Sequence, residues 1–96
     1  PSEEAMKMAR DYLAAVKSGD NLQLLEFCVA NENSDSRKTA EFISAAKGLL
    51  VKELATEHDA KSKKQLMDKI DVLDKCTYYM RVNTGIKHIY GLLSVS

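Results

Sequence analysis

The sequence contains no tryptophan, two phenylalanines and a single proline, which is residue 1. With so few large aromatic residues, we expect a core built mainly from aliphatic side chains. Because no proline lies inside the chain, no position forces a helix to break. No apolar run approaches the roughly 20 residues of a membrane helix, so we expect no membrane partner.

Charge of either sign is not in excess, because 14 basic side chains balance 14 acidic ones. Residues 1–48 carry six basic against eight acidic side chains (−2), and residues 49–96 carry eight against six (+2). A neutral chain has no long-range field that attracts nucleic acid or an anionic membrane. The lysines at 61, 63, 64 and 69 have acidic residues on both sides, at 57, 59, 68, 71 and 74, and indicate a solvated surface. We therefore expect no nucleic-acid partner.

Cysteine is scarce as well, with only Cys28 and Cys76. Both stand beside apolar residues at helical positions, which is typical of reduced, buried thiols, although one disulfide between them is arithmetically possible. Reduced thiols and the absence of a signal peptide predict an intracellular protein, cytoplasmic or nuclear. The start at Pro-Ser-Glu-Glu, without methionine, indicates a domain that belongs to a longer protein.

Helical spacing dominates the chain, and no segment alternates long enough to predict a strand. We therefore predict an all-α fold, a single small domain over residues 1–96 with about five helices, either a helical bundle or a short helical-hairpin array. The expected helices cover residues 3–18, 20–30, 36–57, 60–81 and 84–93.

The ends of these helices carry typical capping residues. Ser2 and Asp20 are expected N-caps, Gly19 is expected in the left-handed conformation after the first helix, and Asn83 or Thr84 is expected to cap the last one. Gly48 interrupts the third helix at a cost of about 1 kcal/mol relative to alanine and is a candidate for close packing.

The second helix is predicted to turn Leu22, Leu25, Cys28 and Val29 to the core, with Leu24 and Phe27 widening this face. Several apolar residues, including Leu24 at the edge of this face, fall off the central stripes of the predicted helices and are expected to line a groove or a dimer interface. These residues are Met6, Leu24, Val51, Met67 and Val72.

Catalytic and metal-binding patterns are missing. The possible metal ligands, Cys28, His58, Asp59, Cys76 and His88, do not have the spacing of a known metal motif. A Cys76–His88 pair would be needed for thiol catalysis, but Cys76 occupies the position of a small core residue between Leu73 and Met80. We therefore expect no metal, no cofactor and no enzymatic activity.

Residues 74–93 hold three of the four tyrosines, together with one cysteine and one histidine. Adjacent Tyr78 and Tyr79 project about 100° apart on a helix, so one of them has to lie away from the centre of the core. Aromatic and arginine side chains dominate the energetics of protein interfaces. The predicted partner-binding residues are Tyr78, Tyr79, Arg81, Lys87 and His88.

Residues 83–93, "NTGIKHIYGLL", are similar to the T-G-I-G-K-x-V-x-x-L segment of the transcription-elongation-factor N-terminal domain, although the second glycine is absent and the spacing is shifted. The resemblance implies a helical scaffold that binds short disordered peptides. The matching residues are Thr84, Gly85, Ile86, Lys87, Ile89 and Leu93.

These observations predict a non-enzymatic protein–protein interaction module that binds a peptide or an amphipathic helix in a groove between helices. Two alternatives stay open. One is a self-assembly domain that forms dimers or larger oligomers of a longer protein, and the other is a transcription-elongation-type scaffold domain.

Overall fold

A computed structural model describes residues 2–96 and confirms the all-α prediction. No strand occurs within this range. The five helices are α1 (Glu3–Ser18), α2 (Asn21–Asn31), α3 (Ser36–Thr56), α4 (Ala60–Arg81) and α5 (Ile86–Val95).

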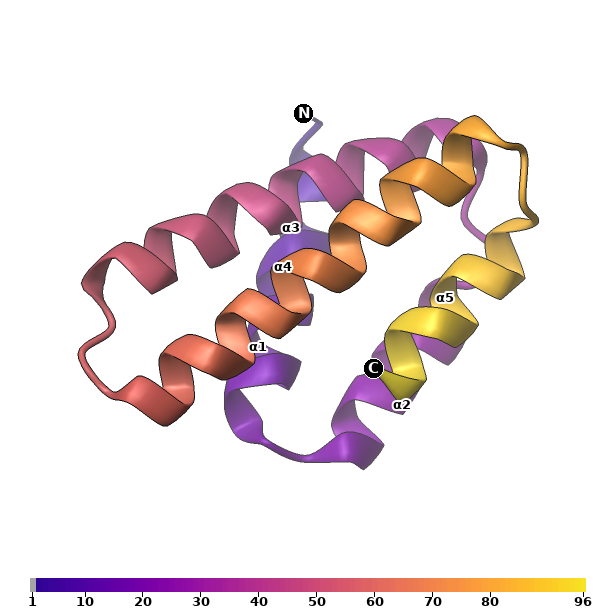
Figure 1. The fold of residues 1–96 in the computed structure, drawn as a ribbon. Helices are drawn as coiled ribbons and strands as arrows, with labels where there is room; N and C mark the ends of the chain where they lie inside the picture. Colours follow the sequence, from indigo (N-terminus) through magenta and orange to yellow (C-terminus); the bar gives the residue numbers. More distant parts are fainter. Residues whose placement is uncertain (1) are drawn as a thin grey trace.

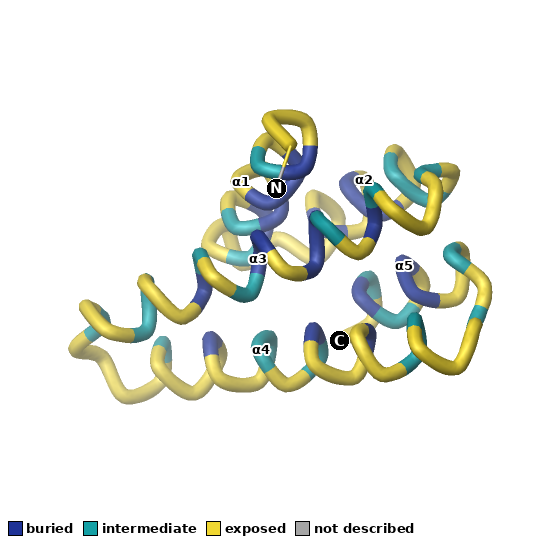
Figure 2. The backbone as a smooth tube through the Cα atoms, turned by 90° about the horizontal axis from the view of Figure 1, so that it is seen from above, coloured by how far each residue is buried: buried dark blue, intermediate teal, exposed yellow. Residues whose placement is uncertain are grey.

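The helices form a closed bundle rather than an open array of hairpins. Each helix packs chiefly against two others, and the neighbours follow the order α1, α3, α4, α5, α2 and back to α1. The two longest helices, α3 and α4, run antiparallel as a hairpin, and α2 and α5 lie side by side at the other edge of the bundle (Figure 1). The inner sides of the helices are buried and their outer sides are exposed (Figure 2).

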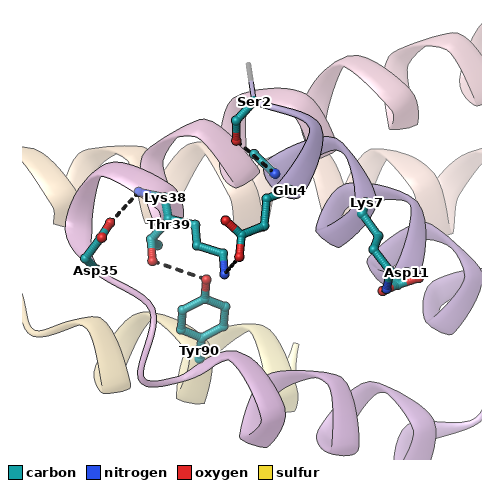
Figure 3. Close-up of polar contacts among 9 residues, drawn as sticks. Ser2, Glu4, Lys7, Asp11, Asp35, Lys38, Thr39 and Tyr90 are labelled. Carbon is teal, nitrogen blue, oxygen red and sulfur yellow. Dashed lines mark hydrogen bonds and ion pairs between the residues drawn. The ribbon is translucent and has the colours of Figure 1, made fainter.

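Side-chain caps begin four of the five helices. The Ser2 hydroxyl accepts a hydrogen bond from the Ala5 amide at 3.1 Å, which Figure 3 shows, and Asp20 accepts one from the Leu22 amide at 2.9 Å. Both predicted N-caps are therefore confirmed. Asp35 and Asp59 cap α3 and α4 in the same way. Gly19 ends α1 in the left-handed region with φ +68°, as its position predicted.

The predicted cap of α5 is wrong. Gly85 occupies the N-cap position and makes no side-chain hydrogen bond. Asn83 instead adopts φ +63° in the turn that leaves α4, a left-handed conformation that asparagine tolerates better than most residues. The amide of Thr84 is used in this turn, where it donates to the Tyr79 carbonyl at 3.0 Å. The tight turn thus moves the start of α5 beyond Thr84.

Most of the core is aliphatic, as the composition predicted, but its centre is aromatic. Phe42 lies between three other rings, with centroid distances of 5.7 Å to Tyr12, 5.5 Å to Phe27 and 6.0 Å to Tyr90. These four rings come from α1, α2, α3 and α5, so they join most of the bundle at one point. Leucine, isoleucine, methionine and alanine side chains surround them.

The face that α2 turns to the core agrees with the prediction only in part. Leu24, Phe27 and Cys28 are buried. The three other apolar residues assigned to the core face point outward, and their exposed fractions are 59% for Leu22, 45% for Leu25 and 57% for Val29. Because α2 is apolar on most of its circumference, its pattern does not select one face. The packing of the Phe27 ring against Tyr12 and Phe42 selects it instead.

The residues predicted to lie outside the inner faces divide into three groups. Leu24 is buried, so its assignment to a groove or dimer interface is wrong, and its predicted place on the core face of the second helix is confirmed. Met6 and Val72 are half-buried against the core. Val51 and Met67 are exposed.

Two buried tyrosines differ in the hydrogen bonding of their hydroxyl groups, so we expect replacement by phenylalanine to have opposite effects on stability at the two positions. The Tyr90 hydroxyl is 3.2 Å from the Thr39 hydroxyl, a hydrogen bond that ties α5 to α3 (Figure 3). The Tyr12 hydroxyl is buried without a hydrogen-bond partner. Since an unpaired buried hydroxyl is unfavourable, we expect Tyr12→Phe to raise the free energy of unfolding by up to about 1 kcal/mol, and Tyr90→Phe to lower it by about 1 kcal/mol. Urea unfolding measures both, and an equal loss in the two variants would contradict the assignment.

Candidate interaction surface between α3 and α4

The outer surface of the α3–α4 hairpin contains a groove of about 630 Å³. We call it the α3/α4 groove. Its lining is Ala40, Ile43, Ser44, Lys47, Gly48, Val51, Lys52, Thr77 and Met80. Seven of these residues come from α3 and two from α4, and most of the surface that they offer is carbon.

Small side chains on α3 create this groove. Ala40, Ser44 and Gly48 follow one another at intervals of four residues, so they lie along one line of the helix. The partly buried side chain of Met80 and the buried side chain of Ile43 give this line an apolar base. The groove therefore exposes a shallow apolar strip beside the backbone of α3.

Gly48 is not required by packing inside the domain. A Cβ atom added at Gly48 would meet no heavy atom within 4 Å, so the sequence-based expectation of close internal packing is wrong. A glycine inside a helix nevertheless costs about 1 kcal/mol relative to alanine. What the missing side chain does provide is open space in the groove.

The charge of the lining is positive. Lys47 and Lys52 belong to it, and no carboxylate does. The Lys47 ammonium lies 2.6 Å from a carboxylate oxygen of Asp74, while Lys52 forms no ion pair with any residue in the range 2–96. Arg81 stands one helical turn after Thr77 and is exposed, which adds a cation at that end of α4.

None of the residues that the sequence predicted as a binding surface lines this groove; they lie at the end of α4 and at the start of α5. Their aromatic rings form a chain, with 5.7 Å between the centroids of Tyr78 and Tyr79 and 5.9 Å between those of Tyr79 and His88. Tyr79 is half-buried, whereas Tyr78 is exposed over 58% of its surface. Arg81 and Lys87 are exposed, without an ion pair in the described chain.

The sequence placed Val51 outside the inner faces and Gly48 in the middle of a helix, but it did not predict the groove. Ala40 and Thr77 are exposed on the groove side, and the sequence predicted neither of them as a surface residue. A glycine in mid-helix close to an apolar residue outside the inner face was the available signal.

The two thiols lie in the core and are free. Burial raises the pKa of Cys28 and of Cys76 to about 11, so both are protonated at neutral pH. His88 is exposed and packs its ring against Tyr79, and no hydrogen bond joins it to Cys76 in the described part of the chain. Over residues 2–96, no group of three or more His, Cys, Asp or Glu side chains is placed to hold a metal ion. None of the five described helices is both long and apolar enough to cross a membrane.

Comparison with known proteins gives no relative. No protein-family model matches this sequence, and comparisons with curated proteins and with solved structures found no similar protein. The segment that resembles the transcription-elongation-factor domain forms the α4–α5 turn and α5, where Ile89 and Leu93 are buried in the core. Core packing accounts for these two matching residues.

Proposed function

We propose that this domain is a non-enzymatic interaction module whose α3/α4 groove binds an amphipathic helix. The observation that carries the proposal is the open, apolar strip along Ala40, Ser44 and Gly48, which is kept open by a glycine that internal packing does not require. A helix that lays its apolar side chains into a groove is a recurrent mode of peptide recognition. Small residues on the receiving helix let the backbones approach closely.

The charges of the groove select the ligand. Lys47 and Lys52 lie in the lining and no acidic residue does, so carboxylates beside the apolar face of the ligand would be attracted. Opposite charges across an interface favour the correct partner and disfavour a ligand with flanking cations. The proposed ligand is therefore a helix with an apolar face flanked by aspartate or glutamate. Arg81 and the exposed Tyr78 extend the surface at the α4 end.

A pair of synthetic peptides tests this proposal. One carries leucines at i, i+3, i+4 and i+7 flanked by glutamates, and the other has lysines in place of the glutamates. Fluorescence anisotropy of labelled peptide should show binding of the glutamate peptide at least about tenfold tighter than that of the lysine peptide. Equal affinities, or no binding of either peptide, would contradict the proposal.

Gly48→Leu should block the groove without harming the fold. The new side chain meets no internal atom at its Cβ, and leucine is a better helix former than glycine, so we expect stability to rise by up to about 1 kcal/mol. The affinity for the glutamate peptide should fall at least about tenfold, because the side chain fills the strip on which the peptide lies.

Gly91→Leu is the matched control. Gly91 is also an exposed glycine within a helix, its added Cβ also meets nothing, and it lies on α5 outside the groove. This variant should gain a similar stability and keep its affinity for the peptide. If both variants bind like the wild type, the peptide does not lie in the α3/α4 groove.

A further inference from the structure

A second apolar surface lies on α2. Leu22, Leu25 and Val29, which we call the α2 stripe, are all exposed, between 45% and 59% of their surface. Their spacing of three and four residues places them within an arc of about 60° on the helix. α2 packs against α1 and α5 with its other sides, so the stripe faces away from the domain.

The surroundings of the α2 stripe are acidic. Residues 18–36 contain Asp20, Glu26, Glu32 and Asp35 and no lysine or arginine. Glu26 follows Leu22 by four residues and Glu32 follows Val29 by three, so the helical spacing puts them beside the stripe, one on each side. Neither glutamate forms an ion pair within the described chain.

These features are the ones that the α3/α4 groove requires of its ligand, namely a helical apolar face flanked by carboxylates. We propose that the α2 stripe of one molecule occupies the α3/α4 groove of a second copy of this chain. This inference rests on the proposed function and names the partner of the same groove. The pairing brings Glu26 and Glu32 of one copy toward Lys47 and Lys52 of the other.

Symmetric pairings of two copies are less favourable because they bring like charges together. Two α2 stripes facing each other would oppose glutamates, and two grooves facing each other would oppose lysines, and like charges across an interface are repulsive. In the ring of helices, α2 has α1 and α5 as neighbours and therefore lies across the bundle from the α3–α4 pair (Figure 1). Contacts through two different surfaces are head-to-tail, so they extend into chains or close into rings.

Complementation between two variants tests this arrangement. Gly48→Leu blocks the groove and leaves the α2 stripe intact, whereas Val29→Lys places a cation in the stripe and leaves the groove intact. Circular dichroism checks that both variants fold, and Gly91→Leu serves as the control that should associate like the wild type. Mass is measured by sedimentation and light scattering from about 10 µM to about 1 mM.

The wild type should grow in mass with concentration beyond the 10.7 kDa of one chain, and the glutamate peptide should reverse this growth. Each variant alone should stay at the mass of one chain. Their equimolar mixture should reach the mass of two chains and stop there, because one intact stripe then meets one intact groove.

Other outcomes overturn the inference in distinguishable ways. If either variant alone associates as the wild type does, the contact is symmetric or uses another surface. If the wild type stays monomeric at every concentration and still binds the glutamate peptide, the groove serves a different protein, and only the pairing with a second copy fails. If the peptide does not bind either, the proposed function itself fails.

Discussion

Replacing Phe42 by alanine is expected to lower the free energy of unfolding by about 3–5 kcal/mol. The Phe42 side chain is completely buried and packs against the rings of Tyr12, Phe27 and Tyr90, which belong to three other helices. Removing it leaves a cavity at the point where α1, α2, α3 and α5 meet. A loss of this size is comparable to the whole stability of a small domain, so a large part of the variant should be unfolded at 25 °C.

Thermal and urea unfolding followed by circular dichroism measure this loss. Tyr78→Ala is the matched control, because it also removes an aromatic ring from a helix, but from an exposed position with one ring contact to Tyr79 and none to the core rings. It should cost less than about 1 kcal/mol. Similar losses in the two variants would contradict the aromatic centre of the core.

Two adjacent leucines on α2 are expected to differ strongly in their contribution to stability. Leu24 is 4% exposed and Leu25 is 45% exposed, so Leu24→Ala should cost about 2–5 kcal/mol and Leu25→Ala less than about 1 kcal/mol. Both substitutions put alanine at an interior position of the same helix, so helix propensity changes equally and the difference reports burial alone. Urea unfolding of the two variants gives the comparison.

The outcome decides which face of α2 is in the core. The helical spacing alone predicted Leu22, Leu25 and Val29 inside, and a larger loss for Leu25→Ala than for Leu24→Ala would restore that prediction. The α2 stripe would then not be a surface, and the proposed pairing between copies would lose its basis.

Most of the local structure was predictable because its signals are local. Ser2 and Asp20 cap helices through hydrogen bonds that span two or three residues, and Gly19 provides the left-handed conformation that ends α1. The positions of Cys28 and Cys76 among apolar helical residues predicted their burial, and both are buried.

The errors concern choices that only tertiary packing makes. Which face of α2 points to the core depends on the packing of Phe27 against Tyr12 and Phe42, and these residues are far apart in the sequence. The start of α5 depends on the turn at Asn83, which has a left-handed backbone conformation. The sequence offered Asn83 and Thr84 as possible caps and did not indicate this conformation. Short-range patterns carry no information on either choice.

The candidate groove also depends on tertiary packing, so the sequence did not reveal it. Gly48 and Val51 were both unusual within the predicted third helix, the first as a mid-helix glycine and the second as an apolar residue outside the inner face. A groove also needs a second wall, and Thr77 and Met80 supply it from α4 through the antiparallel hairpin. The sequence predicted the aromatic surface at Tyr78 and Tyr79 instead, because aromatic and cationic residues are close together there.

The most direct test of the central claim is a map of backbone chemical-shift changes in the isotope-labelled domain as the glutamate peptide is added. The largest changes should fall on residues 40–52 of α3 and on 77–81 of α4, the two walls of the α3/α4 groove. Changes centred on Tyr79, Lys87 and His88, with α3 unaffected, would place the binding surface at the α4–α5 end and contradict the groove as the site of recognition.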